Sequence, residues 1–107
     1  MSAKFDFSAL QKGFTAVWPV TVNVPQDGGT VKEETFSVRF RLLGQEEINT
    51  LAKDADPFAI AKAYLVELVD GPELTDAMKT AMLDAGWVRG GLAAAYNQFA
   101  TGAAAKN

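Results

Sequence analysis

The sequence predicts an α+β fold in which an N-terminal antiparallel β-hairpin is followed by about four α-helices. Two stretches with apolar residues at every second position predict the strands, and a turn-forming run between them predicts the hairpin. At Gly44 the apolar spacing changes to three and four residues, which is the rhythm of a helix. This switch places the strands before the helices.

The composition is that of one small domain with a real core. The chain has 107 residues, of which 49% are hydrophobic, and its net charge is −3. The basic residues are scattered, so nucleic acid is not an expected partner, because binding it requires a concentrated basic surface. No apolar run approaches the roughly 18 residues of a membrane span, and the N-terminus lacks the apolar core of a signal peptide. We therefore expect no membrane partner.

The N-terminal segment, residues 1–14, is compatible with two structures. Phe5 and Phe7 alternate as in a strand, whereas Ala3, Phe7 and Leu10 suit a helical turn. In either case Gly13 is expected to end the segment.

The hairpin is expected over residues 16–43. Pro19 in its first strand suits the edge of a sheet, because proline has no amide proton to donate. Residues 25–29, Pro-Gln-Asp-Gly-Gly, favour a turn, and the second strand follows from Val31. A hairpin alone is marginally stable in water, so its apolar face is expected to pack against the helices. The residues of that face are Trp18, Val20, Val22, Val24, Phe36, Val38, Phe40 and Leu42.

The helical half is expected over residues 44–101. Gly44 opens the first helix, where Glu46 and Glu47 suit the positive end of the helix dipole. The second helix is predicted to have Asp56 as its N-cap and Pro57 at its first helical position. It ends near Asp70, and its apolar stripe consists of Phe58, Ala61, Tyr64, Leu65 and Leu68.

Two more helices are expected before the end of the chain. Thr75 is predicted to cap a third, short helix, and Gly86 separates this helix from the last one. Gly102 is predicted to stop the last helix. Residues 102–107 are expected to be a frayed tail, and residues 1–107 are expected to form a single domain.

The chain lacks the residues of most common active sites. It contains no His and no Cys, which removes the commonest general base, the usual zinc ligands and the thiol nucleophile. The acidic pairs are interpreted as a turn between helices (Asp54 and Asp56) and as a solvated first helical turn (Glu46 and Glu47). We therefore expect no enzyme activity, no catalytic or metal-binding residues and no cofactor. The absence of cysteine also suits a cytoplasmic protein.

Three further features receive structural interpretations. Arg39 and Arg41 lie on the polar face of a strand, where a solvated surface is favoured over a phosphate contact. Gly90 and Gly91 would expose bare backbone and permit close approach by another helix. The eight aromatic residues at apolar-face positions are assigned to the core, with one or more expected in an exposed contact patch. They are Trp18, Phe36, Phe40, Phe58, Tyr64, Trp87, Tyr96 and Phe99.

Residues 36–52, FSVRFRLLGQEEINTLA, resemble the strand-to-helix pattern of tail assembly chaperones of long-tailed bacteriophages and prophages. Trp87-Val88-Arg89 and the stretch from Leu92 to Tyr96 are similar to the family's last helix, so the resemblance covers about residues 16–107. Gly44 departs from the pattern, which normally has Ser or Thr there. The matching residues are Phe36, Arg39, Phe40, Arg41, Leu43, Gln45, Glu47, Ile48 and Leu51.

The resemblance implies a non-enzymatic role in tail assembly. Such chaperones bind the long, mostly helical tape measure protein in the bacterial host cytoplasm and keep it soluble until tail tube subunits polymerise around it. They are expected to be absent from the mature virion. Many also have a longer form made by ribosomal frameshifting, and residues 105–107 can be encoded with a slippery heptamer, a hypothesis that the gene sequence tests.

The expected contact with the tape measure protein lies on the last helix. Our hypothesis assigns it to Trp87, Leu92, Tyr96 and Phe99. The tail tube protein is a further candidate partner, and self-association stays open. The alternative function is that of a small structural virion protein, such as a minor tail or head–tail joining component.

Overall fold

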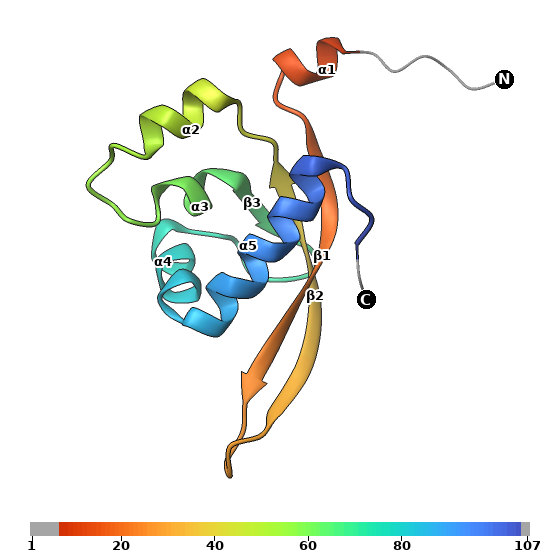
Figure 1. Cartoon of the computed structure of the whole chain (residues 1–107), viewed down its shortest axis with the longest axis vertical. Coiled ribbons are helices and arrows are strands. Elements are labelled where there is room, and N and C mark those ends of the chain that lie inside the picture. Colours follow the sequence, from red (N-terminus) through yellow and green to blue (C-terminus); the bar gives the residue numbers. More distant parts are fainter. Residues whose placement is uncertain (1–6, 106–107) are drawn as a thin grey trace, which may run out of the picture.

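The predicted hairpin is present and forms the long axis of the molecule (Figure 1). The computed structural model describes residues 7–105. Strand β1 (Thr15–Pro25) pairs antiparallel with β2 (Val31–Arg41) over the full length of both strands. The turn between them is closed by a 2.8 Å hydrogen bond from the Gln26 amide to the Thr30 carbonyl, with Gly28 and Gly29 both at positive φ. The expected turn chemistry is thus confirmed.

One face of the hairpin is apolar, as the alternation predicts. Val20 pairs with Phe36 and Trp18 pairs with Val38, so cross-strand neighbours place their side chains on the same face. The side chains of Val20 and Val38 are completely buried there. On the opposite face, Thr21 and Thr35 share an exposed hydrogen bond, as expected for a polar surface.

A third strand, β3 (Leu65–Leu68), pairs antiparallel with β2 and was not predicted. The expected helix through Leu65 and Leu68 is therefore wrong, because α3 (Ala59–Tyr64) ends where β3 begins. The physical reason is that a strand at this position pairs with the backbone amide and carbonyl groups on the edge of β2 and buries the Leu65 side chain. An ion pair of 3.0 Å between Arg39 and Glu67 also links the two strands.

The start of α3 differs from its prediction by two residues. Phe58 occupies the N-cap position, so Asp56 is not the N-cap and Pro57 is not the first helical residue. Asp56 nevertheless accepts a 2.9 Å hydrogen bond from the Phe58 amide through Oδ1. The Asp56 carboxylate therefore accepts a hydrogen bond from the amide of the N-cap residue and not from an amide in the first turn of the helix.

The other helices follow their predicted signals, except that Gly86 is the first residue of the last helix and Ala85 is the break before it. Helix α2 (Gln45–Leu51) follows Gly44, which provides no side-chain cap. Helix α4 (Asp76–Asp84) is capped by the Thr75 hydroxyl, and α5 (Gly86–Thr101) ends at Gly102 in the left-handed conformation. In the N-terminal segment, α1 (Ser8–Gln11) adopts the helical alternative. Ala3 and Phe5 lie outside the described residues, as does the end of the expected tail.

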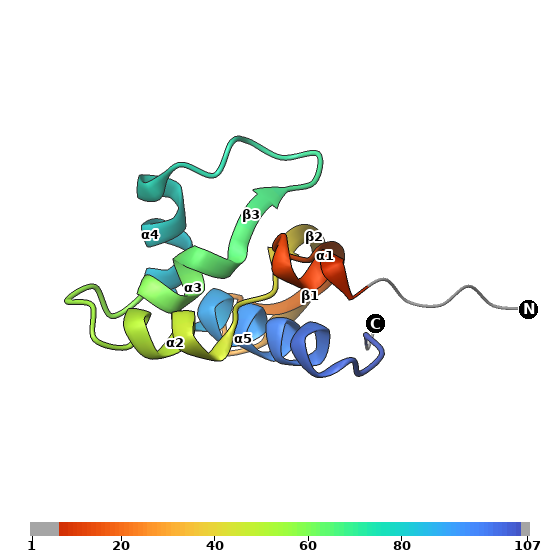
Figure 2. The same cartoon turned by 90° about the horizontal axis from the view of Figure 1, so that it is seen from above.

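Helices α2 to α5 lie on one side of the sheet, with the core between these two layers, whereas the exposed α1 lies at the start of β1 (Figures 1 and 2). Phe40 is the centre of this core, with its ring 5.5–5.6 Å from the rings of Tyr64, Tyr96 and Phe99. Tyr64 and Tyr96 stack with their centroids 4.0 Å apart, and the Tyr96 hydroxyl accepts a 3.0 Å hydrogen bond from the Leu43 amide. The buried core consists of Val20, Val22, Val38, Phe40, Leu43, Tyr64, Leu65, Leu83, Leu92, Ala95 and Phe99.

Helix α5 approaches the sheet closely at Gly91. A Cβ atom there would lie 2.6 Å from the Thr21 carbonyl oxygen and 2.7 Å from Cγ1 of Val22. The bare backbone at Gly91 thus permits close contact with strand β1. The prediction that another helix would approach the glycines is wrong at this position. At Gly90 a Cβ atom would meet nothing within 4 Å.

We predict that Phe40→Ala lowers the free energy of unfolding by about 3–5 kcal/mol, because it removes a completely buried ring. Urea unfolding measures this loss. Val17→Ala is the control, since that side chain is 44% exposed on the opposite face of β1. Equal unfolding midpoints for the wild type and Phe40→Ala would contradict the assignment of Phe40 to the core.

We also predict opposite effects of alanine at the two adjacent glycines. Gly91→Ala is expected to destabilise the protein by about 1–3 kcal/mol, because the new methyl group overlaps β1. Gly90→Ala is expected to stabilise it by up to about 1 kcal/mol through helix propensity. Thermal unfolding of both variants tests this pair, and a stabilising Gly91→Ala would show that α5 does not contact β1 as described.

Candidate protein-binding groove

The four residues expected to contact a partner do not form one exposed surface. Leu92 and Phe99 are buried, and Tyr96 is half-buried with its hydroxyl bonded inside the fold. They form the side of α5 that packs on the sheet, so they are not available to a partner in this structure. Only Trp87 stays exposed, at 42% of its surface, because it lies off that side in the first turn.

Trp87 instead borders an apolar groove of about 430 Å³ at the end of the helical layer. The floor comes from the apolar face of the hairpin, and the walls come from α4, the start of α5 and the segment after β3. Among its lining residues, Val69, Met78 and Trp87 are large apolar side chains with more than a third of their surface exposed. The groove is lined by Val22, Phe36, Ser37, Leu68, Val69, Asp70, Gly71, Met78, Met82, Trp87 and Val88.

The groove exists because β3 is much shorter than the strand it pairs with. The link between β3 and β2 ends with a 3.0 Å hydrogen bond from the Val69 amide to the Ser37 carbonyl. Asp70 then adopts a positive φ of 60°, and the chain leaves the sheet before it returns to α4 (Figure 2). Phe36, further along β2, therefore borders an open space, while Val22 stays packed against α5 at Gly91.

The chemistry of the groove suits a protein partner. Its lining is largely apolar, and Met78 and Met82 are flexible side chains that adapt to differently shaped partners. Exposed apolar side chains gathered in one place are typical of protein-binding surfaces. Met78 and Met82 are four residues apart, as on one side of a helix, but this spacing does not reveal that they line a groove.

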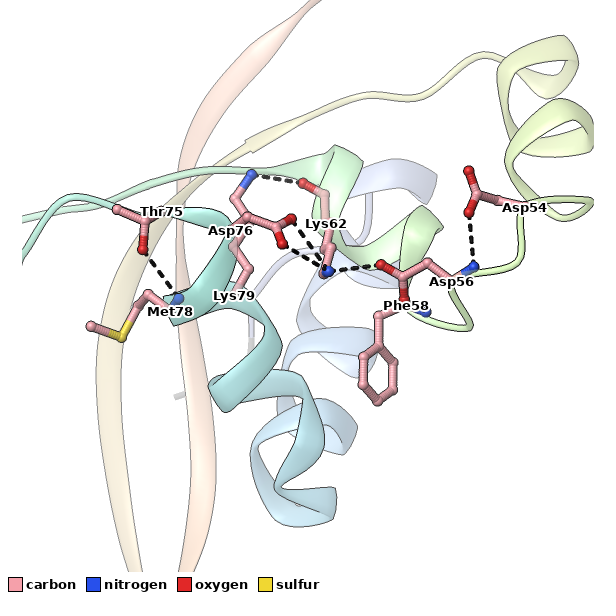
Figure 3. Close-up of polar contacts among 8 residues, drawn as sticks. All are labelled: Asp54, Asp56, Phe58, Lys62, Thr75, Asp76, Met78 and Lys79. Atoms are coloured by element: carbon pink, nitrogen blue, oxygen red, sulfur yellow. Dashed lines mark hydrogen bonds and ion pairs between the residues drawn. The ribbon is translucent and has the colours of Figure 1, made fainter.

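Outside the groove, a cluster of polar side chains around Lys62 has a structural role (Figure 3). Its ammonium group lies 2.7 Å from Oδ2 of Asp56 and 3.3 Å from Oδ1 of Asp76. The Lys79 ammonium donates a 2.9 Å hydrogen bond to the Lys62 carbonyl oxygen. These contacts fasten α3 to α4 and to the preceding loop, where Oδ1 of Asp54 accepts from the Asp56 amide.

The charged residues singled out in the sequence are engaged in similar pairs. Arg41 binds both carboxylate oxygens of Glu47, at 2.9 and 2.8 Å, so Glu47 is paired rather than simply solvated. Arg39 binds Glu67 and the Thr15 hydroxyl. In the described part of the chain, no group of three or more acidic side chains is placed to hold a metal ion. Nor does any helix there combine the length and apolar character needed to cross a membrane.

Comparisons with family models, curated proteins and solved structures found no significant match to this chain. The groove is therefore interpreted from its own residues.

We predict that the Asp56–Lys62 pair makes stability depend on pH in the acid range. The hydrogen bond from Lys62, followed by that from the Phe58 amide, lowers the pKa of the Asp56 carboxyl. Its contribution is fully present above the unfolded value of about 3.9 and is lost as the pH falls through the lower folded pKa. Urea midpoints of the wild type and Asp56→Asn should therefore differ at pH 7, and the difference should shrink below about pH 4 and disappear as the pH falls through the lower folded pKa. A difference that persists unchanged at pH 2 would contradict this role.

Proposed function

We propose that this chain is a non-enzymatic binding protein whose groove holds an amphipathic helix of another protein. The observation that supports this most directly is the open apolar groove where the helical layer stops and the hairpin continues. A helix placed there would extend the existing layer, with Val22 and Phe36 beneath it and Met82 and Trp87 beside it. Its apolar stripe would be buried in the way that grooves of other helix-binding proteins bury theirs.

The resemblance to tail assembly chaperones suggests which protein supplies that helix. We propose the tape measure protein of a long-tailed phage or prophage, whose long helices would aggregate if left exposed. The chain would act in the cytoplasm of the bacterial host and leave before the virion is complete. A longer, frameshifted form and a contact with the tail tube protein belong to the same proposal.

The groove favours a role in which the partner is released. Methionine-rich and loop-bordered surfaces bind many related helices without a rigid fit. A holding protein needs such distributed contacts, because the client has to be passed to the assembling tail. The alternative, a small structural virion protein, would instead keep its partner permanently, and mass spectrometry of purified particles distinguishes the two.

The proposal is tested by co-expressing the chain with the tape measure protein. We predict that Trp87→Ala sharply reduces the soluble fraction of this client, because a buried interface tryptophan contributes about 2 kcal/mol or more, equivalent to about thirtyfold in affinity. Val66→Ala is the matched control, since Val66 is also 42% exposed but does not line the groove. If the wild type and both variants are folded and keep the client equally soluble, the proposal is wrong.

A further inference from the structure

We propose that the groove selects helices that carry a Lys or Arg beside their apolar stripe, and that Asp70 pairs with this cation. The inference rests on the proposed function, because it names the kind of helix that the same groove would bind. It assigns recognition to one carboxylate in an otherwise apolar or neutral lining.

Asp70 is the only charged residue among those described as lining the groove. It is exposed, and the structure records no hydrogen bond or ion pair for its carboxylate within the described residues. Its backbone is fixed immediately before it by the bond between the Val69 amide and the Ser37 carbonyl. The backbone at Asp70 is thus anchored at the border of the groove, and the exposed carboxylate is available to a partner.

Cationic side chains on the elements that form the groove are bonded to other groups. On α4, Lys79 donates to the Lys62 carbonyl, and on α5, Arg89 donates a 2.6 Å hydrogen bond to the Leu83 carbonyl. On β2, Lys32 is paired with Glu34 at 3.2 Å. None of these three side chains is paired with Asp70, which leaves its charge open to a cation of the partner.

The surroundings strengthen the preference for a cation. A bound helix would exclude water from the apolar walls, and a charge pair at the border of such a surface is less screened than one in open solvent. An acidic residue at the same position of the partner would face Asp70 without compensation. Repulsion of this kind is a common source of specificity between otherwise similar partners.

The chemistry of the sheet edge favours a helix over an extended strand as the occupant. Beyond Ser37 the outer edge of β2 is not paired with β3, and a strand would have to add there. That edge carries the charged and exposed residues Lys32, Glu33 and Glu34. Charged side chains at an open edge are a known means of preventing strand addition.

The test uses the full chain and two labelled synthetic peptides of 18 residues, about five helical turns. The peptides share one leucine-rich stripe and differ only at the positions beside it, which are all Lys in one peptide and all Glu in the other. Fluorescence anisotropy gives the affinity of each peptide for the wild type and for Asp70→Asn, Asp70→Lys and Trp87→Ala. Circular dichroism checks that every variant folds, and Asn tolerates the positive φ at this position.

The expected result is about tenfold tighter binding of the Lys peptide by the wild type, because Asp70 attracts the Lys positions and repels the Glu positions. Asp70→Asn should remove most of this preference, and Asp70→Lys should reverse it. Trp87→Ala should weaken both peptides by similar factors. Added salt should reduce the preference more than it reduces binding of the peptides in general.

Failure of the inference and failure of the proposed function give different results. If both peptides bind the wild type equally and Trp87→Ala weakens them, the groove binds helices but Asp70 does not select them. A preference that persists in Asp70→Asn also overturns the inference. If neither peptide binds, or if Trp87→Ala has no effect on either, the groove is not a helix site and both ideas fail.

Discussion

The packing of α5 against the hairpin is the contact on which the rest of the structure depends. Phe40 of β2 meets aromatic rings from α3 and α5, so three segments far apart in the sequence converge on one side chain. The close approach at Gly91 lets α5 lie directly on β1. Without this contact the hairpin would lose the cover of its apolar face, and a two-stranded hairpin has little stability alone.

The groove follows from a mismatch between the two layers. The strands of the hairpin have eleven residues each, whereas β3 has four, and the hairpin extends past the helices (Figure 1). Phe36 therefore lines open space near the end of the helical layer. The proposed binding site is thus a consequence of how the core is built, and it needs no additional element of its own.

The sequence predicted the features that depend on neighbouring residues. The turn at Gly28 and Gly29, the Thr75 cap and the stop at Gly102 each rest on local chemistry, which one segment carries by itself. Leu65–Leu68 was missed because a short apolar run fits both a helical and a strand period. The exposure of Trp87 depends on what α5 packs against, and such distant contacts leave no periodic signal in a single sequence.

The hairpin has an inner half inside the core and an outer half outside it. Between Asn23 and Thr35 every residue is exposed except the half-buried Val24, so the strands there are held mainly by their own ladder of hydrogen bonds. The two strands should therefore separate first at the turn and then progressively toward the core. Their amide protons should exchange with solvent fastest near the turn and more slowly toward the core. A partner that covers Phe36 would stop this opening nearer to the turn. Binding in the groove would therefore slow the exchange of hairpin amides that the partner does not contact.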